Sequence, residues 1–121
     1  MKSDLMFRGD LHAPRAARMA LDDLVHDLDG RLLADLRLVV TEMVTSIIRT
    51  GNGAPLAVRV EILSPDHLRG EVVEDGDPVT GSASLTEEAT APILDELTTR
   101  WGLGPHPRRM WFEIEAEAPA A

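Results

Sequence analysis

The stretch from Leu32 to Thr50, LLADLRLVVTEMVTSIIRT, constrains the fold of this chain more than any other. Its apolar residues recur at steps of three and four, which places them on one broad stripe of an α-helix. Asp29 can cap this helix, because its carboxylate can accept hydrogen bonds from the free N–H groups of the first turn. Gly51-Asn52-Gly53 predicts the helix end, since glycine takes the left-handed conformation that a C-terminus often needs. We therefore expect one long helix whose stripe packs into the core.

Two polar residues, Glu42 and Ser46, lie one turn apart within this helix. The pair could serve chemistry, or it could belong to ordinary surface. Glutamate is a common helix former, and a helical serine often hydrogen-bonds to the carbonyl four residues before it. Both interpretations stay open on the residues alone.

The remaining elements follow from changes in the hydrophobic period. From Leu56 the apolar residues alternate with others, which is the two-residue period of a half-buried strand. Because the turn at residues 64–67 is short, strands over 56–62 and 68–74 should form an antiparallel hairpin. Further elements are expected as follows: a strand over 4–8, a helix over 15–28 after Pro14, a helix over 87–99 that starts late or kinks near Pro92, the beginning of a strand at 101–103, and a strand over 109–115.

This order, β-α-α-β-β-α-β-β, predicts an α+β fold: a two-layer sandwich with helices on one face of a mostly antiparallel mixed sheet. Residues 75–86, DGDPVTGSASLT, are rich in turn formers and should be a loop. We expect residues 1–116 to form a single domain and residues 117–121 to form a flexible tail.

Composition narrows the classes of partner. The net charge of −9 argues against nonspecific nucleic-acid binding, which relies on Lys and Arg. It fits a basic protein partner, although acidity is also common in soluble domains. The chain has no cysteine and no apolar run of signal-peptide or membrane-span length, so a cytoplasmic protein without membrane contact is expected. The histidines share no local spacing that suggests a metal site, so none is expected: His12, His26, His67 and His106.

Two stretches of the chain resemble a known family. DLRLVVTEMVTSIIRTG resembles the N-box helix of the GHKL ATPases, in the branch of anti-sigma-factor serine kinases and small actinobacterial ATP-binding regulators. TTRWGLGPHPRRMWFEIE resembles the closing strand pair of that branch, and AVRVEI with LRGEVVEDGDP resembles the pair before its G1 box. The resemblance runs from about residue 5 to 115 and implies the Bergerat-type two-layer sandwich.

The N-box of that family reads E-x-x-x-N. In it the Glu activates water or a hydroxyl, and the Asn coordinates the magnesium that bridges the ATP phosphates. The resemblance places Glu42 at the Glu and Ser46 at the Asn, while Thr50 stands at a basic His one turn later. A hydroxyl is a poorer and shorter magnesium ligand than an amide oxygen, so this departure implies weaker metal binding.

The G1 box, D-x-G-x-G, is also incomplete. With Asp75 at the adenine-binding Asp, both glycine positions are lost. In a second register Glu74 takes the Asp position and Gly76 keeps the first glycine. Across the two registers, the resemblance leaves Ser46, Asp75 and Gly76 as the residues of a vestigial nucleotide pocket.

The G2 box departs furthest from the family. Its G-x-G-L falls on Glu88-Ala89-Thr90-Ala91, where glycines normally present backbone N–H groups to the phosphates. Carboxylates at Glu87 and Glu88 would repel a triphosphate by roughly 1 to 4 kcal/mol per charge pair. No Lys or Arg between residues 75 and 99 offsets them.

The resemblance and its departures together imply a regulatory protein-binding module similar to an anti-sigma factor. It would be a pseudokinase without a cofactor, whose partner is a sigma factor or a STAS-type antagonist. The alternative is an active ATP-dependent serine/threonine protein kinase that acts on an anti-sigma-factor antagonist, with ATP and magnesium as cofactors. Glu42 would then be the base, Asp75 the adenine ligand and Ser46 a substitute metal contact. A third interpretation is a subunit that forms a homodimer or binds another small ligand in the vestigial pocket.

Overall fold

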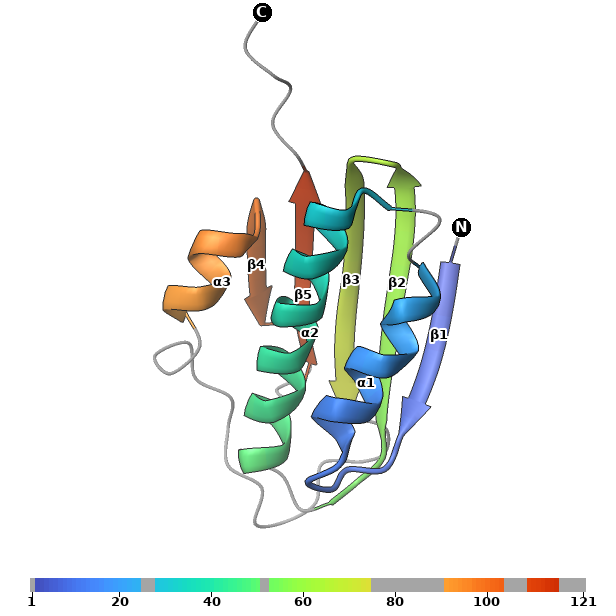
Figure 1. Ribbon diagram of the computed structural model, residues 1–121. Coiled ribbons are helices and arrows are strands. Elements are labelled where there is room, and N and C mark those ends of the chain that lie inside the picture. Colours follow the sequence, from blue (N-terminus) through green and yellow to red (C-terminus); the bar gives the residue numbers. More distant parts are fainter. Residues whose placement is uncertain (1, 25–27, 51–52, 75–90, 104–108, 116–121) are drawn as a thin grey trace, which may run out of the picture.

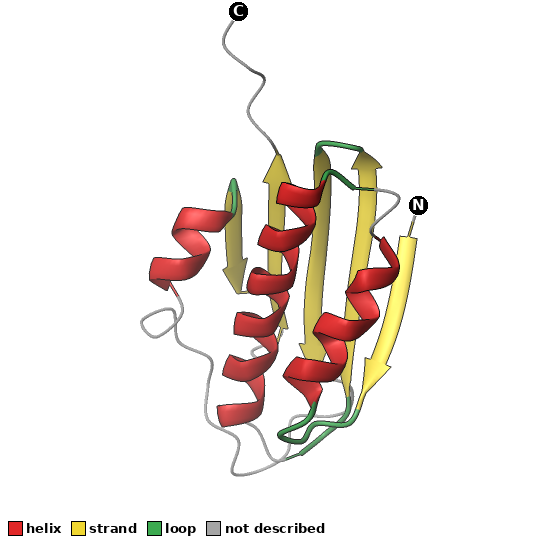
Figure 2. Ribbon diagram, in the orientation of Figure 1, coloured by secondary structure: helices red, strands yellow, loops and turns green. Residues whose placement is uncertain are grey.

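The computed structural model describes residues 2–24, 28–50, 53–74, 91–103 and 109–115. These residues form two layers, with a sheet on one side and helices on the other (Figures 1 and 2). The elements in chain order are β1 Lys2–Phe7, α1 Ala13–Leu21, the 3-10 turn η1 Asp22–Leu24, α2 Gly30–Thr50, β2 Leu56–Ser64, β3 His67–Glu74, α3 Ala91–Leu97, β4 Arg100–Leu103 and β5 Arg109–Glu115. The expected α+β sandwich is confirmed.

The sheet has the strand order β1-β2-β3-β5-β4. Every pairing among the described strands is antiparallel, so the sheet is more uniform than the mixed sheet expected. The last strand, β5, lies between β3 and β4, which places the C-terminal end of the fold inside the sheet rather than at its edge (Figure 1).

The long helix α2 begins and ends where its sequence predicts. The Asp29 carboxylate accepts a hydrogen bond of 2.8 Å from the backbone N–H of Arg31, which satisfies a free donor of the first turn. The helix ends at Thr50. Gly53, shortly after it, has a φ of 91°, a left-handed conformation that favours glycine. Gly51 and Asn52 lie outside the described residues.

The apolar stripe of α2 fills the space between the two layers. Leu36, Val39, Val40, Met43 and Val44 are fully buried. They form one hydrophobic cluster with residues of the inner sheet face, namely Val58, Val60, Leu68, Val72, Met110, Phe112 and Ile114. Burial of each large apolar side chain contributes about 1.5 to 3 kcal/mol, and α2 supplies more buried apolar residues than any other described element.

The first helix, α1, is shorter than expected. It ends at Leu21 and is followed by η1, so the α-helix expected over 15–28 is wrong at residues 22–24, while residues 25–27 lie outside the described residues. Asp22 and Asp23 explain this, because carboxylates near a helix C-terminus oppose the helix dipole and Asp is a poor helix former. Leu28 is nevertheless buried, as the apolar pattern indicated.

The third helix and the segments around it were also predicted from the sequence. α3 begins at Ala91, directly before Pro92, in agreement with a late start. The loop over 75–86, the turn after Leu103 and the tail over 117–121 lie outside the described residues. No helix in the described part of the chain is both long enough and apolar enough to cross a bilayer.

Gly70 on β3 provides a test of this packing. A Cβ atom added there would lie 2.6 Å from the Phe112 ring and 2.6 Å from the carbonyl oxygen of Arg59. Gly70→Ala should therefore lower the free energy of unfolding by about 1 to 3 kcal/mol, measured by urea titration. Gly30→Ala is the control, because nothing lies within 4 Å of its added Cβ. A Gly70→Ala protein as stable as the wild type would contradict this packing.

Candidate functional site

The flank of α2 that carries Glu42 and Ser46 faces away from α1. Arg37 forms an ion pair of 3.4 Å with Asp22, and this pair marks the flank next to the end of α1. At 3.6 residues per turn, Glu42 and Ser46 lie about 140° and 180° around the helix from Arg37. They therefore lie on the side of α2 where α3 packs, and both are half-buried (Figure 1).

The rest of the predicted nucleotide pocket cannot be placed beside them. Asp75 and Gly76 lie in the segment 75–90, outside the described residues, as do Glu87 and Glu88. The described elements on either side of that segment are β3, which ends at Glu74, and α3, which begins at Ala91. The structure thus places Glu42 and Ser46 on one long helix, while the N-box, G1 and G2 assignments all stay predictions.

The element next to this flank, α3, is tied to the sheet by a tryptophan. The indole N–H of Trp101 on β4 donates a hydrogen bond of 2.8 Å to the Asp95 carboxylate on α3. Trp101 also packs against the hydrophobic core. This pairing fixes α3 against the end of the sheet, so Trp101 has a structural role.

The outer face of the sheet carries charged side chains that the helices do not cover. Glu71 on β3 lies between two arginines of the neighbouring strands. Arg59 on β2 donates to one of its oxygens at 2.9 Å, and Arg109 on β5 donates to the other. Asp4 on β1 lies 3.8 Å from Arg59 and extends this row across four strands. The row lines a depression of about 550 Å³ on the open face.

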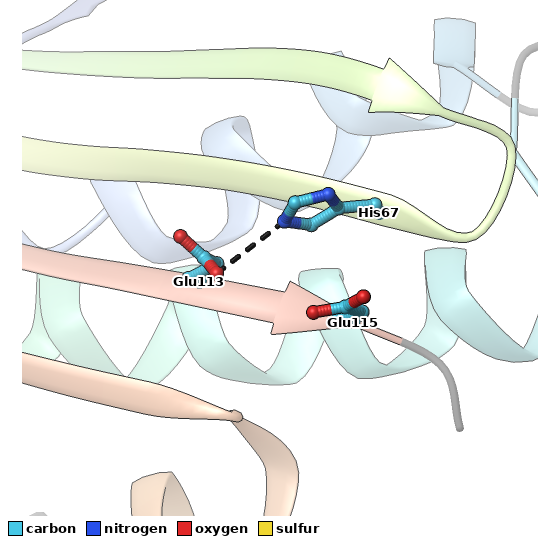
Figure 3. Close-up of side chains that lie close together, drawn as sticks. All are labelled: His67, Glu113 and Glu115. Atoms are coloured by element: carbon cyan, nitrogen blue, oxygen red, sulfur yellow. Dashed lines mark ion pairs between the residues drawn. The ribbon is translucent and has the colours of Figure 1, made fainter. Parts of the chain in front are cut away.

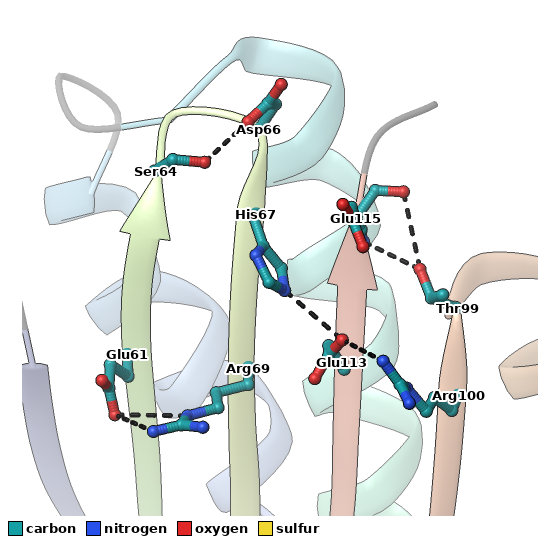
Figure 4. Close-up of polar contacts among 9 residues, drawn as sticks. All are labelled: Glu61, Ser64, Asp66, His67, Arg69, Thr99, Arg100, Glu113 and Glu115. Atoms are coloured by element: carbon teal, nitrogen blue, oxygen red, sulfur yellow. Dashed lines mark hydrogen bonds and ion pairs between the residues drawn. The ribbon is translucent and has the colours of Figure 1, made fainter. Parts of the chain in front are cut away.

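Two further groups of charged residues lie on the same face (Figure 4). Arg69 pairs with Glu61 at 3.1 Å, and Arg100 pairs with Glu113 at 2.8 Å. Trp111 on β5 lies directly across from Glu71 and is half-buried. A Cβ atom on Gly102 would come within 2.9 Å of its indole ring, so the glycine makes room for the tryptophan.

Burial and the neighbouring arginines act in opposite directions on the pKa of the Glu71 carboxyl. Partial burial alone would raise the pKa of its carboxyl, but the hydrogen bonds from Arg109 and Arg59, together with their positive charge, outweigh burial and lower the pKa below 4.5. Hydrogen bonding by Arg100 likewise lowers the pKa of Glu113, against a smaller opposing effect of burial. Both carboxylates therefore stay ionised at neutral pH.

Sequence reasoning placed these residues on strands but did not pair them. The signal was the polar half of each two-residue alternation, which identifies the residues that face away from the core. Their partners depend on the register between strands, such as Glu71 opposite Trp111 and diagonal to Arg109. Because β3 and β5 are far apart in the sequence, that register was not predictable from local pattern.

Among the comparisons with known proteins, a match to a solved structure supports the fold. No protein-family model matches the chain, and no curated protein matches it. Among solved structures, a chain in the crystal structure of the RsbU and RsbW domains of Rv1364c from Mycobacterium tuberculosis is similar, with a TM-score of 0.70 at 13% sequence identity. The similarity covers 94% of this chain and 31% of that chain, so the present chain spans about a third of its length.

At that level of identity the similarity establishes the shared fold and nothing finer. That fold is the two-layer α+β sandwich which the order of elements and the GHKL resemblance both led us to expect. Function must therefore be argued from the residues that the sandwich places together.

Glu71 supplies a pH-dependent test of the outer face. Because its folded-state pKa lies below its unfolded value, its pairing stabilises the fold above the unfolded pKa and is lost as pH falls through the folded pKa. Glu71→Gln should therefore cost about 1 kcal/mol of unfolding free energy near pH 7. This cost should shrink as pH falls from about 5 toward 3, as measured by denaturant titration at each pH.

Glu96→Gln, at an exposed position on α3, controls for the loss of one negative charge. A cost of Glu71→Gln that stays constant or grows toward low pH would contradict the assigned role of Glu71.

Proposed function

We propose that this chain is a regulatory protein-binding module resembling an anti-sigma factor, in which nucleotide binding is weakened or lost. The observation that carries the proposal is a helix α2 with its core packing intact but with Ser46 one turn after Glu42. The family to which the chain bears a resemblance uses an asparagine at that position to hold magnesium. The serine hydroxyl is a poorer and shorter ligand than an asparagine amide. The helix therefore keeps its packing role while its part in magnesium binding is weakened.

The charge of the segment that runs from Asp75 through α3 supports the same conclusion. Residues 75–99 contain no Lys or Arg, whereas they include Asp75, Asp77, Glu87 and Glu88. A triphosphate requires compensating positive charge or free backbone N–H groups, and carboxylates near it cost about 1 to 4 kcal/mol each. A segment of this composition is poorly suited to cover a nucleotide.

The partner in this proposal is a protein, either a sigma factor or a STAS-type antagonist. An excess of negative charge over the whole chain, −9, favours association with a basic surface and speeds encounter at low salt. The similar solved structure includes an RsbW domain, which is in keeping with a regulatory module of this fold. Binding to purified sigma factors and STAS proteins encoded beside this chain, followed by fluorescence anisotropy, would identify the partner class.

Calorimetric titration with ATP and magnesium tests the loss of nucleotide binding. We expect no saturable heat with a dissociation constant below about 100 μM, because each carboxylate near the phosphates weakens binding by roughly tenfold or more. Saturable binding at low micromolar concentration would overturn the proposal.

Restoring the family residues sharpens this test. The triple variant Ser46→Asn, Glu88→Gly and Thr90→Gly should bind ATP and magnesium at least about tenfold more tightly than the wild type. The single variant Glu96→Gln, outside the aligned boxes, is the control for removal of one negative charge. Equal affinities of the triple variant and the wild type would show that these departures are not the cause.

The alternative, an active serine/threonine kinase, is favoured by one feature. Glu42 is retained at the position of the family's catalytic base and lies half-buried on a rigid helix. The kinase alternative predicts phosphate transfer from ATP to a serine of a co-encoded antagonist. Glu42→Ala should reduce the rate of this transfer about 100-fold or more. Phosphorylation assayed with labelled ATP separates the two functions, and absence of transfer counts against the kinase.

A further inference from the structure

Three metal-ligating side chains meet on the outer face, at the end of the sheet where β5 finishes. They are His67, at the first position of β3, and Glu113 and Glu115, near the end of β5 (Figure 3). Glu113 and Glu115 share a face because they are two residues apart on a strand, and His67 is paired directly across from Glu115. One ligand atom from each residue lies within 4.8 Å of the others.

The imidazole of His67 supplies a second, independent observation. Its Nε2 atom is buried and makes no hydrogen bond within the part of the chain that the structure describes. A buried polar atom without a hydrogen bond is costly, and within the described residues an ion pair with Glu113 is what offsets that cost for Nε2. Nε2 lies 3.4 Å from a carboxylate oxygen of Glu113, beyond the usual length of a hydrogen bond.

That separation is what a shared metal ion would produce. Zinc lies about 2.1 Å from nitrogen and carboxylate ligands in a tetrahedral site, which sets neighbouring ligand atoms about 3.4 Å apart. We propose that His67, Glu113 and Glu115 form a binding site for a divalent transition metal, with zinc as the best fit. One imidazole and two carboxylates would leave the fourth position to water at the exposed rim. Magnesium and calcium prefer all-oxygen sites, and the imidazole disfavours them.

Neighbouring contacts hold the backbone of this site in place (Figure 4). The Ser64 hydroxyl donates to the Asp66 carboxylate at 2.6 Å, within the tight turn that leads into His67. The backbone N–H of Glu115 donates to the Thr99 hydroxyl at 2.8 Å, which fixes the end of β5. The two strand ends are thus positioned before any ion binds, which lowers the cost of binding.

One residue competes with the metal. The Arg100 guanidinium donates to the same Glu113 oxygen that faces His67, at 2.8 Å. Its side chain is 64% exposed, so it can turn into solvent when a cation takes its place. The proposed metal would link β3 to β5 on the face opposite the helices, and it does not depend on the proposed function of α2.

Zinc titration of the whole chain in a chelator-free buffer, followed by calorimetry, tests the site. We expect one zinc ion per chain with micromolar affinity and no comparable binding of magnesium. His67→Ala and Glu115→Gln should each weaken zinc binding at least about tenfold. The matched controls His12→Ala and Glu96→Gln, at exposed positions away from the cluster, should bind zinc as the wild type does.

Arg100→Gln distinguishes competition between Arg100 and the metal from a purely structural role of the Arg100–Glu113 ion pair. Removal of the competing guanidinium should tighten zinc binding several-fold, whereas loss of a needed contact would weaken it. Zinc should also raise the thermal unfolding midpoint of the wild type by several degrees, since a ligand that binds only the folded state stabilises it. Glu115→Gln, at an exposed residue, keeps the test decisive if His67→Ala fails to fold. Absent zinc binding, or binding that neither ligand variant weakens, overturns the proposal.

Discussion

Burial of the α2 stripe against the inner face of the sheet is the interaction on which the rest of the structure depends. Val40, Met43 and Val44 on the helix meet Leu68 and Phe112 on the central strands, all with little or no exposed surface. The chain has few aromatic residues, 3% in all, so aliphatic packing must supply most of the core. Once α2 is fixed in this way, its two flanks and the open sheet face acquire definite positions.

This arrangement separates two surfaces with different chemistry. One is the α3-facing flank of α2, where Glu42 and Ser46 lie. The other is the outer face of the sheet, which the helices do not cover. Arginine–glutamate ion pairs lie on this face, as between Arg59 and Glu71. Because the apolar core lies between them, we expect a substitution on one surface to leave the other intact. In our proposals, nucleotide binding at the flank of α2 is weakened or lost, and the metal site on the outer face of the sheet does not depend on it.

Most of the fold was predictable because its signals are local. The stripe and cap of α2 and the alternation of the strands need only short windows of sequence. The early end of α1 was not predicted, because the apolar residues continue to Leu28 while Asp22 and Asp23 oppose the helix. The cluster of His67 with Glu113 and Glu115 was not predictable either. It arises only when β5 inserts beside β3, and sequence spacing gave no reason to join them.

The central proposal is a folded core in a chain whose nucleotide binding is weakened or lost. Nuclear magnetic resonance of the 15N-labelled chain during titration with ATP and magnesium tests it most directly. The backbone amides of Glu42 and Ser46 report on the flank of α2, and those of Phe112 and Met110 report on the packed core. We expect dispersed core resonances, as in a well-packed fold, and no saturable shifts at Glu42 or Ser46 at ATP concentrations up to about 100 μM. Saturable shifts at these two amides at low micromolar ATP would contradict the proposed weakening or loss of nucleotide binding.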